Sequence, residues 1–203
     1  MVRILPGGKW LVAATQSSED QSAAVVVWDL ENPEDRGGGC MLLAKCRTRT
    51  RVSQLVVRYM SHKGKRGIAI ATLRSIGDKP ATKMEVCVIH ISLEALEKLS
   101  ANQDPGGPPF NLVELHKTRC QVAFLNLEGV LLSVVHRPRT LMFLDLETKQ
   151  SSQLKLPYSH EAPVSLKSLA FSGADKLYAA TFDSGKQNPS TPEPGAGGSY
   201  DIL

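Results

Sequence analysis

The apolar residues of this chain fall into short runs that are typical of strands. Residues 23–30, 86–91 and 130–135 are almost continuously apolar. Short turns rich in glycine separate such runs, at 6–8 (PGG), 128–129 (EG) and 172–173 (SG). Short turns join antiparallel neighbours, so the pattern predicts an all-β protein of antiparallel sheets.

A unit of four strands recurs along the chain, and its third strand gives the clearest alignment. Residues 25–31 (VVVWDLE) match 141–147 (LMFLDLE), and 87–94 (CVIHISLE) take the same place between them. The repeat predicts units at about 2–48, 49–118, 119–160 and, incomplete, 161–203.

The strands expected within these units follow from the apolar runs and their turns. They are 2–5, 10–15, 23–30 and 41–46; 52–60, 67–73, 84–92 and 110–116; 121–126, 130–135, 140–146 and 153–156; and 165–171 and 176–182. Leucines spaced three apart in 92–100 predict a short helix after a third strand. Residues 185–199 are rich in Pro, Gly and Ser, which predicts a low-complexity loop.

The lack of apolar–polar alternation decides between two architectures. An ordinary antiparallel sheet has one wet face and alternates. A sheet that is apolar on both faces must be covered on both, as in the blades of a propeller. We therefore predict a partial, open β-propeller of four-stranded antiparallel blades, WD-repeat-like, with a two-sheet sandwich as the alternative. An open arc should show no ladder between residues 2–5 and 199–203, and should aggregate or require a partner.

The sequence contains few residues or motifs that indicate catalysis or the binding of a cofactor or metal. Trp28 and Asp29 end a third strand, where a WD pair plays a structural role and the Asp fixes the adjoining turn. The sequence has no P-loop, no Gly-x-Ser-x-Gly elbow, no CxxC pair among its four cysteines and no close pair among its five histidines. We expect no catalytic, cofactor or metal site. Unpaired cysteines and the lack of a signal peptide or membrane span predict a cytoplasmic or nuclear protein.

The charge is unevenly distributed. The formal net charge is +4, yet residues 36–77 hold ten Lys and Arg and no Asp or Glu. Within them Arg47, Arg49 and Arg51 alternate with threonines, so in an extended chain the three guanidinium groups face one way. Such a row can hold carboxylates bidentately. We identify these arginines as candidate partner-binding residues for an acidic protein, with a merely solvated connection as the other interpretation.

Two alternatives to protein binding follow from the same sequence. Residues 36–77 would suit nucleic acid or another polyanion, although the aromatic residues that stack on single-stranded bases are missing. A propeller enzyme with its catalytic residues in further blades is the second alternative. A non-enzymatic protein-interaction scaffold remains the preferred function.

One family resemblance adds to this picture. Residues 4–12 (ILPGGKWLV), followed by 27–31 (VWDLE), resemble the propeller region of fungal F-box proteins. The resemblance implies the target-binding part of a ubiquitin-ligase adaptor, whose ligase contact comes from an N-terminal F-box. Because the chain opens on a first strand, we expect it to be a piece of a longer protein in which any F-box precedes Met1.

Overall fold

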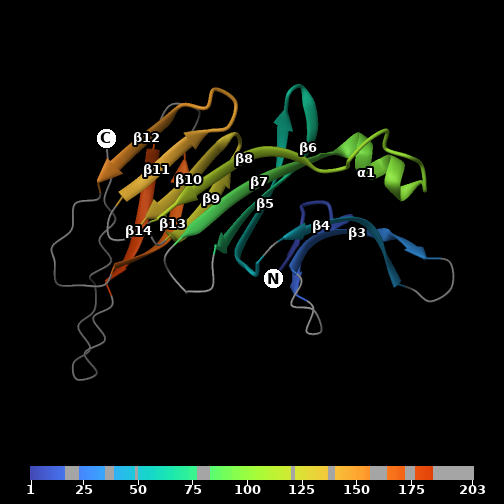
Figure 1. Ribbon diagram of the computed structural model, residues 1–203, viewed down its shortest axis with the longest axis horizontal. Coiled ribbons are helices and arrows are strands. Elements are labelled where there is room, and N and C mark those ends of the chain that lie inside the picture. The colour runs from blue at the N-terminus through green and yellow to red at the C-terminus, as the bar shows by residue number, and fades with distance from the viewer. Residues whose placement is uncertain are drawn as a thin grey trace, which may run out of the picture.

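The protein is all-β in the part of the chain that the structure describes. The computed structural model describes residues 1–16, 23–34, 39–48, 50–76, 83–119, 122–136, 140–155, 164–171 and 177–184. These residues form three four-stranded antiparallel sheets, one two-stranded sheet and one short helix (Figure 1).

Each sheet is a meander in which consecutive strands are neighbours. The first sheet holds β1 (Val2–Ile4), β2 (Trp10–Gln16), β3 (Ala23–Glu34) and β4 (Gly39–Thr48). The second holds β5 (Val52–His62), β6 (Lys65–Ser75), β7 (Met84–Ser92) and β8 (Asn111–Thr118), with α1 (Leu93–Ser100) after β7. The third holds β9 (Val122–Glu128), β10 (Leu131–His136), β11 (Thr140–Asp145) and β12 (Ser151–Lys155). The fourth pairs β13 (Val164–Phe171) with β14 (Leu177–Ser184).

The register of the strands confirms the alignment of the third strands. Asp29 pairs with Trp10, Ser92 with Gly67, and Asp145 with Leu131, so these three residues hold the same place in successive sheets. Asp29, Ser92 and Asp145 are therefore equivalent positions of one repeated unit.

The side-chain oxygen at this position has the same task each time. Asp29 Oδ1 accepts a hydrogen bond from the backbone N–H of Glu31 at 2.9 Å, and Asp145 Oδ1 accepts one from Glu147 at 2.8 Å. Ser92 Oγ accepts from the backbone N–H of Ala95 at 3.1 Å and so caps α1. The expected helix is thus confirmed. The expected turn after Asp29 is not, because β3 continues to Glu34 and the Asp29 hydrogen bond lies at a bulge within the strand.

The sheets pack on one another in chain order. β5 contacts β1 and β2, β9 contacts β5 and β6, and β13 contacts β9. Residues of β6 and β7 face the first sheet and the third sheet alternately, and both groups are buried. Ile68, Ile70, Ile89 and Ile91 join the core shared with the first sheet, and Ala69, Ala71, Val86 and Val88 join the core shared with the third. The second sheet is therefore covered on both faces, as its apolar runs predict.

The hairpin between β5 and β6 is longer than predicted. We expected strands at 52–60 and 67–73, but pairing continues to His62 and Lys65. Two residues close the hairpin, Lys63 with φ 51° and Gly64 with φ 75°. Positive φ at both positions makes a type I′ turn, whose twist matches that of the strands and lets them pair to the tip.

The other strand limits agree to within a few residues, with β3 and β4 the main exceptions. These two strands extend past the predicted 23–30 and 41–46, because a register shift between Asp29 and Pro33 carries the ladder around a bulge. The predicted loop at 185–199, residues 199–203 of the predicted open end and Cys120 lie outside the described residues.

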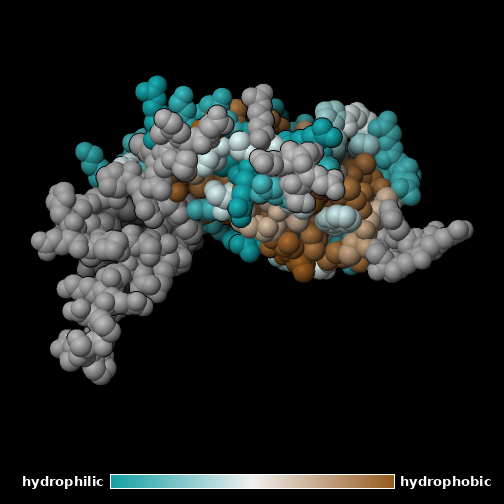
Figure 2. Space-filling model, turned by 60° about the horizontal axis from the view of Figure 1, so that its bottom comes forward, coloured by the Kyte–Doolittle hydropathy of each residue, from teal (hydrophilic) through white to brown (hydrophobic). Residues whose placement is uncertain are grey.

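The outer face of the first sheet, turned away from the second, carries mainly apolar side chains beside the exposed Lys45 and Arg47. Pairing places Val2, Ile4, Leu11, Ala13, Ala24, Val26, Trp28 and Leu42 on this face. Ile4 is 62% exposed and Leu42 is 42% exposed. Figure 2, which brings the lower side of Figure 1 forward, shows apolar residues gathered beneath the first sheet. An exposed patch of this kind favours association with other apolar surfaces.

This face should make the isolated chain self-associate. Replacing Ile4 and Leu42 by threonine keeps β propensity while removing exposed apolar area. Because a fully buried aliphatic side chain contributes about 1.5–3 kcal/mol, the double variant should associate at least ~10-fold more weakly. Sedimentation velocity over a range of concentrations measures the change.

Leu112 provides the matched control, since it is 61% exposed on β8, away from this face. Leu112→Thr should leave the association constant unchanged. A wild-type chain that stays monomeric at every concentration would contradict the prediction.

Candidate functional site

The structure describes two of the three predicted partner-binding arginines. Arg47 is exposed near the end of β4, and Arg51 is exposed just before β5. Arg49 lies outside the described residues. Thr48 Oγ1 donates a hydrogen bond to the Thr50 carbonyl at 3.1 Å, and the backbone bends at Thr50. Whether the three guanidinium groups face one way stays a prediction.

One basic residue of segment 36–77, which contains no Asp or Glu, forms an ion pair inside the fold. Arg74 pairs with Glu85 across β6 and β7, and Lys117 of β8 lies 3.9 Å from the second carboxylate oxygen. Glu85 is only 5% exposed, so this ladder satisfies a buried charge. Arg74 is therefore a structural residue.

A cleft lies where the second sheet meets the turn between β1 and β2. Tyr59, Met60, Ser61, Arg66, Gly67 and Leu93 line it, and its volume is about 160 Å³. We call it the rim cleft. Tyr59 donates a hydrogen bond from its hydroxyl to the Pro6 carbonyl at 3.1 Å, which ties the cleft to the first sheet. β5, β6 and the start of α1 thus form one concave surface.

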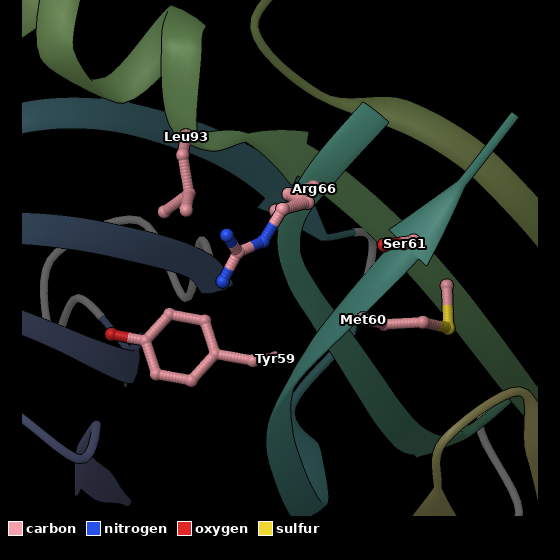
Figure 3. A pocket seen from close by; sticks show the side chains of 6 residues that line it. Tyr59, Met60, Ser61, Arg66 and Leu93 are labelled. Carbon is pink, nitrogen blue, oxygen red and sulfur yellow. The ribbon is translucent and has the colours of Figure 1, made fainter. Parts of the chain in front are cut away.

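Arg66 is the charged residue among those that line the rim cleft. Figure 3 shows its guanidinium group between the side chain of Leu93 and the ring of Tyr59, while Met60 points away. Among the described residues, Arg66 has no hydrogen-bond or ion-pair partner. An arginine carries five N–H donors in a planar fork, and Arg66 is exposed, so the cleft offers these donors to a carboxylate.

The surroundings of Arg66 are also basic. Lys63 and Lys65 are exposed at the tip of the β5–β6 hairpin, which lies beside α1 (Figure 1). The nearby Glu94 already pairs with Lys98 at 2.8 Å, and this hydrogen bond lowers the pKa of the Glu94 carboxyl. Burial and the Lys63 charge lower the pKa of His62, which favours the neutral imidazole. The hairpin tip therefore attracts anions through lysine and arginine.

Two potentially reactive side chains of the second sheet, Cys87 and His90, are held in unreactive environments. Burial raises the pKa of the Cys87 thiol to about 11, which keeps it protonated and weakly nucleophilic at neutral pH. His90 is 2% exposed, and its Nε2 lies 3.2 Å from the Met60 carbonyl oxygen. Burial lowers the pKa of His90, which matches a structural imidazole.

In the ranges that the structure describes, no group of His, Cys, Asp and Glu side chains could hold a metal ion. No helix in that part of the chain has the length and apolar character needed to span a membrane.

Sequence reasoning missed Arg66 and Tyr59. The Lys63-Gly64 pair between two apolar runs is a hairpin signal, and it would have placed Lys63, Lys65 and Arg66 at an exposed tip. Nothing in the sequence predicts that Leu93 and Pro6 lie close to Tyr59 and Arg66, because they belong to other elements.

Comparisons with known proteins do not assign a family. No family model matches the chain, and no curated protein matches its sequence. Among the solved structures that match is the AfRom2 CNH domain, with 9% sequence identity and a TM-score of 0.47. The match covers 90% of this chain and 67% of that domain. A likeness at this identity and TM-score identifies neither a family nor a function.

Proposed function

We propose that the chain is a non-enzymatic protein-interaction scaffold, whose sheets are blades of an open, WD-repeat-like propeller and whose rim cleft receives an acidic segment of a partner. The observation that carries the proposal is the guanidinium group of Arg66, held in a cleft without a partner among the described residues. Arg66 is exposed, so its guanidinium group is open to a ligand.

The geometry of the cleft favours a carboxylate ligand. The guanidinium group lies between Tyr59 and Leu93 (Figure 3), which reduces the entropy lost when a partner binds. Hydrogen bonds to charged groups contribute about 1.5–3 kcal/mol. Lys63 and Lys65 at the hairpin tip add long-range attraction, which raises the association rate more than the affinity.

The distribution of basic residues favours a protein over a polyanion. Lys45 and Arg47 pair with Val26 and Ala24, which places them on the outer face of the first sheet. Lys63, Lys65 and Arg66 lie at the rim, while Arg74 is neutralised by Glu85. A nucleic acid needs a continuous row of phosphate contacts, and these residues are divided among separate surfaces.

The proposal extends to the protein's role in the cell and to its location. The resemblance of residues 4–12 and 27–31 to fungal F-box proteins supports a role as the target-binding part of a ubiquitin-ligase adaptor. The free thiols of Cys40, Cys46 and Cys87 support a reducing compartment, and therefore a cytoplasmic or nuclear location.

The test is capture of partners from a cell extract by the immobilised chain, with and without Arg66→Glu. Charge reversal should lower the recovery of the wild-type partners at least ~10-fold, since it removes an ion pair and adds repulsion. Mass spectrometry should find an acidic segment in these partners, and a peptide of that segment should compete for binding.

Lys155→Glu is the matched control, because Lys155 is exposed on β12, outside the rim cleft. It should leave recovery unchanged. Loss of all bound protein after nuclease treatment would instead support the polyanion alternative. Equal recovery by the Arg66 and Lys155 variants would exclude the rim cleft.

The same assay tests the three arginines found by sequence. Replacing Arg47, Arg49 and Arg51 together by alanine should change stability little, because exposed charges contribute about 0–1 kcal/mol each. A reduced recovery at low salt would show that they steer the partner toward the chain.

A further inference from the structure

A second hollow lies among β1, β5 and β9, the first strands of the three four-stranded sheets. Its volume is about 360 Å³, against about 160 Å³ for the rim cleft. Small-molecule sites occupy about 300–1,000 Å³ and combine apolar walls with a few polar groups. Leu55, Val57 and Leu125 line the second hollow as buried apolar residues, and Arg3 and Arg58 line it as exposed charged residues. The second hollow therefore has the size and composition of a site for a small charged molecule.

Arg3 reaches the second hollow from the first sheet. It pairs with Val12 across β1 and β2, and residues directly opposite each other in a ladder direct their side chains to the same face. Val12 belongs to the core shared with the second sheet, so Arg3 also faces the second sheet, where β1 contacts β5. Because Arg3 is exposed, its guanidinium group is open to a ligand.

Arg58 reaches the second hollow from β5 and is held in place there. Its Nη1 donates a hydrogen bond to the Val57 carbonyl at 3.0 Å, which folds the guanidinium group back against its own strand. This bond uses one of the five N–H donors of an arginine, so the others are available to a ligand. A side chain that the protein already holds loses less conformational entropy when a ligand binds.

The two arginines have no acidic counterpart in this hollow. Of the described residues that line it, none is Asp or Glu, and neither Arg3 nor Arg58 forms an ion pair with a described residue. Charges of one sign in a concave site raise the local concentration of ions of the opposite sign. A dianion neutralises both guanidinium groups, whereas a monoanion leaves one of them without a counterion.

We propose that the second hollow binds a small dicarboxylate, with one carboxylate at Arg3 and the other at Arg58. A guanidinium group matches the planar geometry of a carboxylate and donates to it bidentately. Phosphate sites are typically built from the backbone N–H groups of helix N-termini and tight loops, whereas strands form this hollow, which favours carboxylates. The buried apolar residues of the hollow contact the hydrocarbon chain of the ligand. The site is separate from the rim cleft and does not depend on the function proposed for it.

The test compares glutarate, which has a carboxylate at each end, with pentanoate, which has the same number of carbon atoms and one carboxylate. In titrations of the full chain followed by ligand-observed NMR, wild type should bind glutarate about 10-fold more tightly than pentanoate, as expected for an additional charged hydrogen bond. Arg3→Gln and Arg58→Gln should each weaken glutarate binding about 10-fold, for the same reason. In either variant glutarate should lose its advantage over pentanoate, because only one arginine remains.

Lys155→Gln and Arg66→Gln are the matched controls, because each removes one exposed positive charge outside this hollow. Both should leave the affinity for glutarate unchanged. Equal affinity of wild type for glutarate and pentanoate would overturn the proposal, as would the absence of binding. An equal loss in the control variants would also overturn it, by showing unspecific attraction, and so would inorganic phosphate that binds as tightly as glutarate.

Discussion

Replacing Gly67 by alanine is expected to destabilise the folded chain by about 3 kcal/mol. Strand propensity alone predicts the opposite sign, because glycine inside a strand is roughly 0.5–1 kcal/mol less favourable than alanine. The sign of the measured change therefore shows whether packing or propensity dominates at this position.

The cause is the crowding of β6 against β7. A Cβ atom at Gly67 would meet the Ile91 carbonyl oxygen and the Nε2 atom of His90 at distances that no real structure tolerates. Both residues belong to the paired strand, and His90 is 2% exposed. To admit a methyl group, the two strands must separate and the imidazole must move. That movement also breaks the contact of His90 with the Met60 carbonyl.

Gly64→Ala is the matched control. Gly64 has open space around its Cα, but its φ of 75° strains any other residue, so the expected loss is only about 1 kcal/mol. Urea denaturation of the Ile4→Thr, Leu42→Thr background, which limits self-association, measures both variants. A double-mutant cycle with His90→Ala should show a coupling, since the methyl group then meets the Ile91 carbonyl alone. A Gly67→Ala chain as stable as wild type would contradict the crowding.

Crowding at Gly67 also connects stability with the proposed function. Gly67 lines the rim cleft, next to Arg66 in sequence. A shift of β6 away from β7 would displace the Arg66 guanidinium group from its place beside Tyr59 (Figure 3). Gly67→Ala should therefore also weaken partner capture, whereas Gly64→Ala should not.

The strand order and the equivalence of Asp29, Ser92 and Asp145 were predictable because they depend on local patterns. Apolar runs and glycine turns determine which neighbours pair and in which register. The position of Gly67 within the repeat was also predictable, but its need for glycine was not. Trp10 and Leu131 hold the same place in the other sheets, so the need for glycine comes from the close approach of the Ile91 carbonyl and the buried His90 ring in this sheet alone.

The candidate sites were less predictable, because they join residues far apart in the chain. The rim cleft combines β5, β6 and α1, and the second hollow, lined by Arg3, Arg58 and Leu125 among others, combines β1, β5 and β9. The sequence pointed to Arg47, Arg49 and Arg51 as a site because they alternate with threonines within one short segment. Arg3 and Arg58 are 55 positions apart, and nothing in the sequence relates them until the first strands lie together.

Replacing Asp29 by alanine is the second change with a large expected effect, a loss of about 3 kcal/mol in the free energy of unfolding. Asp29 is fully buried. Its Oδ1 accepts from the Glu31 N–H, and its Oδ2 accepts from the Ser100 hydroxyl at 2.5 Å. Ser100 ends α1, so this carboxylate joins the first sheet to the second. Alanine removes the acceptor of two part-buried hydrogen bonds and a tie between two repeated units.

Asp145 provides the comparison, because it accepts the same backbone hydrogen bond as Asp29 from two residues further on but has no bond equivalent to the one from Ser100. Its Oδ1 accepts from the backbone N–H groups of Glu147 and Thr148 at 2.8 and 2.9 Å, at a partly exposed site. Asp145→Ala should therefore cost only about 1 kcal/mol, as for the loss of a cap. Asp29→Asn should fall between the two, because the amide oxygen still accepts one hydrogen bond. Denaturation midpoints that rank Asp29→Ala and Asp145→Ala equally would show that the bond to Ser100 adds nothing. A larger loss at Asp29 would show that the sheets are held together by a buried polar contact as well as by their apolar faces.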